Sequence, residues 1–574
     1  MGFGGKLGAG RGAGAVVALV ATVALAVPTI PLSWDTGPFN GVVLRHHELC
    51  GVKDLPEEGI QGDVPKVDQL SGRAQAGYNC GLELLGHASL GQDGRPNDNA
   101  NMAWAGHCAY ISSASGISVV PEVPPTRVPG SGVAVVSVTP DGHPTYVRTL
   151  RSPGALSTAE TLNAVTTKDG RSILVVGQYG NDVLGGRKPM DVYDVSNPDC
   201  SKAKLLTTFW WPTNIHNLTI SQDGRVVYAT LPLQAADISG LFDRDPRTGA
   251  KYLGNIEEAL EGPPVAVGPV ANLDDALPQP VRAISHPLDS SHEAWPSADG
   301  RTLYVGGQTP TFEMLSIIDL TRWLQRTPSG VPKGPPRVIS QESGRGHSVR
   351  TATIGGKPYL LHSEEGVFGA AYGCLPQELG PFAGPAQPWL TDISDPAHPR
   401  TISQFGLQIN DPSDCLAQIQ AGENDSVHYH DVDDPTDTTF VMASMWNAGL
   451  RLFDVRHPDK PTEVAYFNPG DVDRTKGVRL DQAWGHVRYL PQSGQIWFAT
   501  AYGGFWVLRI EPQLRQYLGL DAKNARHGLA PASLPAGDQG RPGTLHVVLP
   551  KQVAAIVDTA PWYCTLPAAT GGIL

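Results

Sequence analysis

Charged residues are scarce in this chain, and no stretch of it is strongly basic. Asp, Glu, Lys and Arg together make up 17% of the 574 residues, and the formal net charge is −13. Nucleic-acid binding requires a surface of Lys and Arg that neutralises phosphates, and the sequence has no such run. We therefore exclude nucleic acid as a partner, which leaves a small molecule or a cell-envelope protein.

The motifs of several enzyme classes are also missing. The sequence has no Gly-x-Ser-x-Gly nucleophile elbow, no P-loop and no dinucleotide-binding glycine motif before a helix. Its seven cysteines include no Cys-x-x-Cys pair, which argues against a zinc knuckle and against a thioredoxin-like redox centre. Pairing cannot be deduced from spacing; as a guess we take Cys80 with Cys108 and Cys374 with Cys415, and the odd number leaves one thiol over.

Long apolar segments are confined to the N-terminus. Lys6 and Arg11 precede an apolar stretch over residues 13–27, and Ala24 to Ala26 are the small residues that a signal peptidase requires. Residues 1–32 are therefore predicted to be a signal peptide, with a single membrane anchor as the alternative. In either case the rest of the chain is expected outside the cytoplasm, secreted or in the cell envelope, where disulfides persist.

What the sequence does contain is a repeated strand and turn. Its 65 Gly and 50 Pro indicate many turns, and a hydrophobic content of 41% is ample for a packed core. In four segments apolar residues alternate about an Asp at the period of a strand, and in three of them a Pro follows where the chain must turn. These segments are Asp191–Pro198, Trp389–Pro396, Leu452–Pro458 and Ser316–Leu320.

A hairpin signal lies upstream of these strands. Asp-Gly separates two β-rich runs before Arg171, Arg225 and Arg301, and such a turn accepts positive φ at little steric cost. Hairpin and Asp-strand together recur in seven units, one over residues 108–138 and six that start near Leu162, His216, His292, His347, His428 and His486.

The recurrence of these units predicts an all-β fold, a seven-bladed β-propeller of four-stranded blades over residues 101–515. Residues 33–100 are expected to lead into the first blade. Residues 516–574 are expected to form an irregular tail that packs on the propeller.

Five of the unit starts carry a histidine at a matching position. His216, His292 and His347 each precede a hairpin glycine by eight residues and an aromatic residue by twelve, while His428 keeps the second spacing and His486 the first. Equivalent positions in a propeller are equivalent in space, so several imidazoles are expected to converge on the axis from different blades. The matching region of the second unit, residues 157–161, has no histidine.

Convergent neutral imidazoles are a common protein means of holding Fe, Cu or Zn, and carboxylates behind them fix the ring orientation. Glu293, Glu364 and Asp431 are the candidates for that supporting role. Two other interpretations stay open: a structural repeat in which each His hydrogen-bonds a neighbouring blade, and a metal-free polar pocket. Trp446 and Trp484 stand near the unit starts and could line such a pocket.

The chain resembles the LVIVD-repeat family of bacterial secreted β-propellers from about Gly62 to Glu511. The resemblance rests on the Asp-hydrophobic-Ser-Asp/Asn-Pro strands and on the segments Ser71–Cys80, Leu82–Leu85, Gly106–Tyr110 and Val464–Pro469. It implies a propeller fold and export, and no particular reaction. Where the family pattern leads us to expect His-Glu, this chain has Ala159 and Glu160.

Two functions follow as hypotheses. The first, which we prefer from the sequence, is an exported propeller that binds a ligand or partner at a His-lined axial site. The second is a Fe- or Cu-dependent oxidoreductase, similar in architecture to propeller oxygenases that hold iron with four histidines. Its ligands would be His216, His292, His347 and His428, with Glu293 orienting one of them.

Overall fold

The computed structural model describes residues 39–92, 98–114, 132–156, 158–179, 188–211, 215–224, 226–230, 269–271, 278–280, 282–284, 291–307, 315–325, 333, 337–342, 346–364, 387–411, 414, 425–472 and 479–529. The expected signal or anchor segment, residues 1–32, lies outside them. So do Cys374, Cys415 and the tail beyond residue 529.

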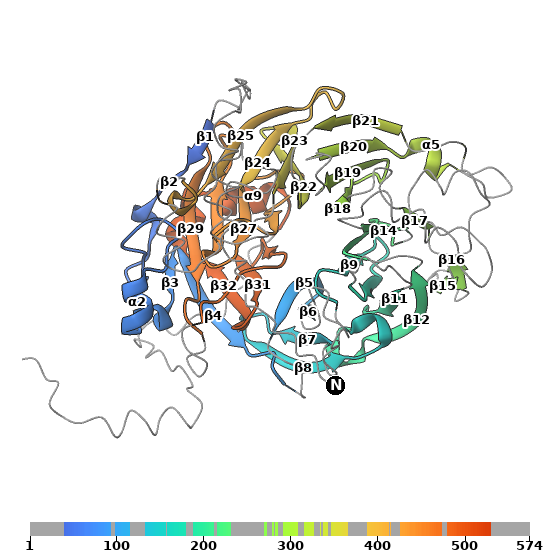
Figure 1. Cartoon of the computed structure of the whole chain (residues 1–574), viewed down its shortest axis with the longest axis horizontal. Helices are drawn as coiled ribbons and strands as arrows, with labels where there is room; N and C mark the ends of the chain where they lie inside the picture. Colours follow the sequence, from blue (N-terminus) through green and yellow to red (C-terminus); the bar gives the residue numbers. More distant parts are fainter. Residues whose placement is uncertain are drawn as a thin grey trace, which may run out of the picture. The chain divides into compact units, whose positions relative to one another are not determined.

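The chain forms small sheets that follow one another around a common centre, in sequence order (Figure 1). The first blade is antiparallel, with strands β5 (Asn99–Ala105), β6 (Cys108–Ser113), β7 (Val133–Val138) and β8 (Pro144–Leu150). The second has the same order, with β9 (Leu162–Thr166), β10 (Ser172–Gly177), β11 (Lys188–Asp194) and β12 (Lys204–Trp211).

Two later blades repeat this pattern. One consists of β18 (Ser291–Pro296), β19 (Thr302–Gly307), β20 (Leu315–Asp319) and β21 (Arg337–Glu342). The next consists of β22 (Val349–Ile354), β23 (Lys357–Ser363), β24 (Pro388–Asp392) and β25 (Arg400–Gly406), and β1 (Phe39–Val42) adds to its outer edge in parallel.

The last two blades recruit strands from the N-terminal extension. The first of them consists of β26 (His430–Val432), β27 (Phe440–Met445), β28 (Gly449–Asp454) and β29 (Thr462–Asn468). Two strands of the extension, β2 (Leu44–Arg45) and β3 (Tyr78–Cys80), pair with its β29. The final sheet takes β30 (Arg488–Leu490), β31 (Gln495–Thr500) and β32 (Gly504–Ile510) from the end of the chain and β4 (Leu82–Ala88) from its beginning.

The described residues therefore contain six blades of at least four strands, not the seven that the repeats predict. The unit that starts near His216 has a three-stranded sheet of β13 (Asn217–Ile220), β14 (Val226–Thr230) and β17 (Arg282–Ile284). In this sheet β17 pairs with β14 in parallel, so the antiparallel order of the other blades is broken. A two-stranded ribbon, β15 (Pro269–Ala271) and β16 (Pro278–Pro280), also falls in this part of the chain.

Apolar side chains pack between neighbouring sheets. One cluster joins Tyr110 and Val133 of the first blade to Leu174 of the second, and another joins Ile111 of the first blade to Trp497 of the last. The first blade thus packs against both its sequence neighbour and the final sheet, so the blades close into a ring.

Helices within the described ranges are few and short. They are the 3-10 turns η1 (His47–Leu49), η2 (Arg73–Ala76), η3 (Pro153–Ala155), η4 (Cys200–Lys202) and η6 (Gln408–Asn410), and the α-helices α2 (Lys66–Ser71), α5 (Thr321–Leu324), α8 (Pro512–Tyr517) and α9 (Leu520–Arg526). Leu514 and Leu518 are buried in a cluster with Phe440, so the described start of the expected tail is helical and packs on a blade. In the described segments, no helix has the length and apolar character needed to cross a membrane.

The four cysteines of the described residues form two disulfides, Cys50–Cys80 and Cys108–Cys200. Our guess that Cys80 pairs with Cys108 is therefore wrong. Cys80 lies in β3, which pairs with β29, and its partner Cys50 also belongs to the N-terminal extension, while Cys108 begins β6 and reaches the turn η4 of the second blade.

Candidate metal centre

Four of the expected histidines meet on the inner edges of consecutive sheets. His216 immediately precedes β13, His292 lies in β18, and His347 and His428 each stand two residues before β22 and β26. Their ring centroids are 4.2 Å apart for His216 and His292, 3.7 Å for His292 and His347, and 4.5 Å for His347 and His428. His292, His347 and His428 are completely buried, and His216 is 6% exposed.

The second blade contributes a carboxylate to this cluster instead of a histidine. Glu160 precedes β9 and is 4% exposed. Its Oε2 lies 3.4 Å from Nε2 of His216 and 3.5 Å from Nε2 of His292, and its Oε1 lies 3.5 Å from Nε2 of His428. The sequence pattern did not identify Glu160 as a site residue, although it stands in the region of the second unit where a histidine is lacking.

A strained turn holds Glu160 in place. Ala159 has φ of +42°, a left-handed conformation that residues with a Cβ rarely adopt. The turn is held by hydrogen bonds from Ala159 N to Ser113 O of the first blade and from Thr161 N to Thr158 O. Strain of this kind persists where the surroundings impose it, often at functional sites.

Protonation states in the cluster match those of metal ligands. Burial opposes ionisation of Glu160, but the surrounding imidazoles, His216 foremost, hold its pKa below the usual value. Burial, and then the neighbouring imidazoles, lower the pKa of His292 and His347 well below the usual range. The cluster therefore combines an anionic carboxylate with two imidazoles, those of His292 and His347, whose neutral form is favoured.

Tyr429 and Trp484 hold individual members of the cluster. The Tyr429 hydroxyl donates to Glu160 Oε2 over 2.6 Å and accepts from Asn217 Nδ2 over 2.5 Å. His428 Nδ1 lies 2.7 Å from the carbonyl oxygen of Trp484, to which it donates, and this fixes the tautomer with a lone pair on Nε2. That Nε2 accepts a hydrogen bond from the indole Nε1 of Trp484 over 2.8 Å.

Two tryptophans, Trp446 and Trp484, flank His428. The rings of Trp446 and Trp484 lie 5.2 Å apart, and Trp446 lies 4.8 Å from the ring of His428. Trp446 has φ of +31°, so the two described non-glycine residues with positive φ, Ala159 and Trp446, are both at this cluster.

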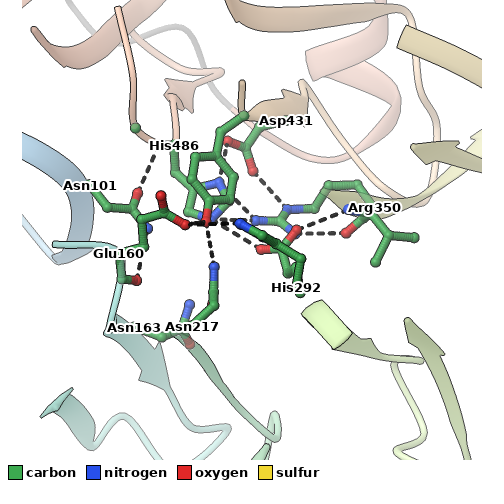
Figure 2. A network of polar contacts seen from close by, with 12 residues as sticks. Asn101, Glu160, Asn163, Asn217, His292, Arg350, Asp431 and His486 are labelled. Carbon is green, nitrogen blue, oxygen red and sulfur yellow. Dashed lines mark hydrogen bonds and ion pairs between the residues drawn. The ribbon is translucent and has the colours of Figure 1, made fainter. Parts of the chain in front are cut away.

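His486, the fifth expected ligand, belongs to a separate ion-pair network. Its Nε2 lies 3.2 Å from Glu293 and its Nδ1 lies 3.2 Å from Asp431. Arg350 binds the same two carboxylates, over 2.8 Å to Glu293 and 3.0 Å to Asp431, and stacks on Trp295. Figure 2 shows Arg350, Asp431 and His486 joined in this network. Glu293 and Asp431, two of the three carboxylates expected to orient the histidines of the cluster, thus pair with Arg350 and His486.

The network and the histidine cluster are adjacent. Glu293 follows His292 in β18, and the ring of Tyr429 contacts both His347, at 5.0 Å between centroids, and His486, at 4.3 Å. Burial opposes the charge on Glu293, but Arg350 and His486 hold its pKa below the usual value. Glu364, the third expected supporting carboxylate, is buried just after β23.

No sulfur atom of the described residues contributes a ligand to the cluster. The two other groups of potential ligands in the described residues each contain a disulfide, Cys50–Cys80 or Cys108–Cys200, whose sulfur atoms have no thiolate to donate. The donors at the axis are imidazole nitrogens and carboxylate oxygens.

Comparison with known proteins supplies no function. No family model matches the chain, and no curated protein matches it. Among solved structures, the chain is similar to the periplasmic gluconolactonase of Pseudomonas aeruginosa, with 13% identity over 64% of this chain and 87% of that one and a TM-score of 0.35. It is also similar to an ancestral GH74 enzyme, with 10% identity over 72% of this chain and 48% of that one and a TM-score of 0.40. A third similar structure is the β-propeller domain of Myceliophteria thermophila Cps50, with 12% identity over 72% of this chain and 99% of that one and a TM-score of 0.37. The chain is a β-propeller, and these similarities are too distant to carry an activity.

Proposed function

We propose that this chain is an exported β-propeller of the LVIVD-repeat kind that holds a transition metal on its axis, with His216, His292, His347, His428 and Glu160 as ligands. The two described disulfides support a location outside the cytoplasm. The sequence favoured a propeller that binds a ligand or partner at a His-lined axial site, and we now propose that this ligand is a metal ion.

One observation carries the proposal. Nε2 of His216, Nε2 of His292 and Oε2 of Glu160 form a triangle with sides of 2.6, 3.4 and 3.5 Å. The point equidistant from its corners lies about 1.9 Å from each atom, so an ion slightly out of the plane would have bonds near the usual ~2.0–2.1 Å to all three. The three atoms are therefore spaced as ligands of one ion, which would take the place of the hydrogen in the hydrogen bond between Nε2 of His216 and Nε2 of His292.

A purely structural role accounts less well for the cluster. Burying an unpaired polar group costs about 1–3 kcal/mol, and apolar residues would fill an axial channel without that cost. Nδ1 of His216 is buried with no hydrogen-bond partner among the described residues. The left-handed conformation of Ala159 costs further conformational free energy, and this conformation places Glu160 in the cluster.

Four imidazoles and a carboxylate suit Fe, Cu or Zn, and exclude a hard-cation site of the Ca²⁺ type, which requires oxygen ligands. Bound there, such a metal would supply Lewis-acid or redox chemistry. The chain itself favours the neutral form of His292 and His347, holds Glu160 ionised and surrounds the cluster with aromatic side chains.

Oxidoreductase activity is the second candidate, because His216, His292 and Glu160 are two histidines and one carboxylate. This donor set with open positions is typical of non-haem Fe(II) oxygenases. Nitric oxide binding to the Fe(II)-loaded protein tests it: a high-spin iron–nitrosyl signal in electron paramagnetic resonance is expected, and unchanged iron spectra would exclude open positions.

The metal proposal is tested by elemental analysis of protein purified gently from the periplasm or the medium. We expect at least one Fe, Cu or Zn per chain, with less metal in His292→Ala and an unchanged amount in His398→Ala, which removes an exposed histidine paired with Asp395. Substoichiometric metal in the unaltered protein, after attempted reconstitution with each of the three ions, would overturn the proposal.

A further inference from the structure

We infer that the axial centre holds two metal ions bridged by the carboxylate of Glu160, one on His216 and His292 and the other on His347 and His428. This inference rests on the proposed metal binding and adds the number of ions and the division of the ligands.

The division is present in the geometry. In the described residues, ligand atoms that all lie within 4.8 Å of one another form two triplets, Glu160 with His216 and His292, and Glu160 with His347 and His428. A single ion with bonds of about 2.1 Å needs all its ligand atoms within roughly 4.2 Å of each other. Five ligands of one ion would form one group, and the cluster forms two that share Glu160.

The two oxygens of Glu160 face different histidines. Oε2 is the atom near His216 and His292, and Oε1 is the atom near His428. A carboxylate that offers one oxygen to each ion is a bridging ligand, and ions in two-metal sites lie about 3.5–4 Å apart. Glu160 can therefore bind both ions, whereas a neutral imidazole at the same position has one lone pair and could bind only one of them.

The second position has its supporting interactions. His428 donates through Nδ1 to the carbonyl of Trp484, the outer contact that metal-binding histidines usually make. The lone pair on its Nε2 is occupied by the indole N–H of the same Trp484. An ion at this position displaces that hydrogen, just as an ion at the first position displaces the hydrogen between Nε2 of His216 and Nε2 of His292.

Charge favours copper in its monovalent form. Two divalent ions would bring four positive charges beside one buried carboxylate, because Glu293 and Asp431 are already paired with Arg350 and His486. Two monovalent ions bring half of that charge, and uncompensated buried charge is strongly unfavourable. Imidazole is a suitable ligand for copper.

The test is an anaerobic titration of the full chain with Cu(I), followed by native mass spectrometry. We expect two copper ions in the unaltered protein and in His398→Ala, and one in each of His216→Ala, His428→Ala and Glu160→Gln. A single ion in the unaltered protein that is lost in both His216→Ala and His428→Ala would overturn the two-ion inference and leave metal binding intact. No bound copper, iron or zinc at all would overturn the proposed function itself.

X-ray absorption of the copper-loaded, unaltered protein tests the same point without any substitution that could impair folding. Copper–copper scattering at about 3.5–4 Å is expected. Copper coordinated by nitrogen and oxygen with no such scattering would contradict the bridge.

Discussion

The hydroxyl of Tyr429 donates a hydrogen bond to Oε2 of Glu160 across 269 positions of sequence and over 2.6 Å. The same oxygen of Tyr429 accepts from Nδ2 of Asn217, so one phenol joins three sheets of the propeller at the axis. Glu160 is thus held between a donor and the surrounding imidazoles, which is how a buried carboxylate keeps its charge.

Tyr429→Phe is expected to destabilise the protein. The substitution removes the hydroxyl that donates to Glu160 and accepts from Asn217, and a buried unsatisfied group costs about 1–3 kcal/mol. We expect the free energy of unfolding to fall by about 2 kcal/mol or more, measured by urea denaturation followed by circular dichroism. Tyr359→Phe on β23 is the control, because the structure records no hydrogen bond of that hydroxyl to a described residue; an equal loss there would refute the specific role of Tyr429.

Trp484→Phe is expected to strengthen metal binding at His428. Phenylalanine keeps the ring but removes the indole N–H that occupies Nε2 of His428. Since a hydrogen bond is worth about 1 kcal/mol net, affinity should rise about fivefold. Competitive titration with a copper chelator measures this. Trp446→Phe is the matched control, because its ring packs edge-on against His428 and its Nε1 makes no hydrogen bond within the described residues; an equal rise there would point to ring size alone.

Ala159→Gly is expected to stabilise the protein. Alanine in the left-handed region costs about 1–2 kcal/mol, and the greater chain entropy of glycine cancels only part of the gain. We expect the free energy of unfolding to rise by about 0.5–1 kcal/mol in chemical denaturation. The same substitution at Ala109, a buried residue in the regular strand β6, should instead lower it. If both substitutions destabilise equally, the turn at Ala159 stores no strain.

His362 makes stability depend on pH. Burial lowers its pKa to about 3, whereas an exposed histidine has about 6.5. Below pH 6.5 the unfolded chain therefore binds a proton that the folded one does not, so stability is lost as pH falls. For His362→Gln, which keeps a polar partner for Thr391, the loss between pH 7.5 and pH 5 should be about 2 kcal/mol smaller than for the unaltered protein. Urea unfolding at the two pH values measures this, and identical losses would contradict it.

Much of this arrangement was predictable from the sequence, because a repeated local pattern becomes a repeated position in space. The Asp-Gly hairpins form as expected: Gly300, for example, has φ of +68° between β18 and β19. The spacing of His216, His292, His347 and His428 to these hairpins predicted that the four rings meet. No such rule places Glu160, which reaches the cluster through the unusual turn at Ala159.

Other features depended on contacts between distant residues. His486 shares the spacing of the other histidines, yet its ring is bound by Glu293 and Asp431, which Arg350 draws together from neighbouring sheets. The parallel pairing of β17 with β14 joins segments separated by about fifty residues without a repeat signal. Spacing along the chain cannot indicate either outcome, because both are decided by partners elsewhere in the fold.

The final sheet has a consequence for how the protein is made. It pairs Leu82–Ala88 with Gly504–Ile510, so its fourth strand is synthesised early and its first three strands last. Since the pairing that closes the ring spans nearly the whole described chain, it must follow release of the C-terminal strands from the ribosome or the export channel. Glu160 and the four histidines of the cluster come from five different sheets and gain their final spacing only then, so a metal bound as we propose would be acquired late in folding.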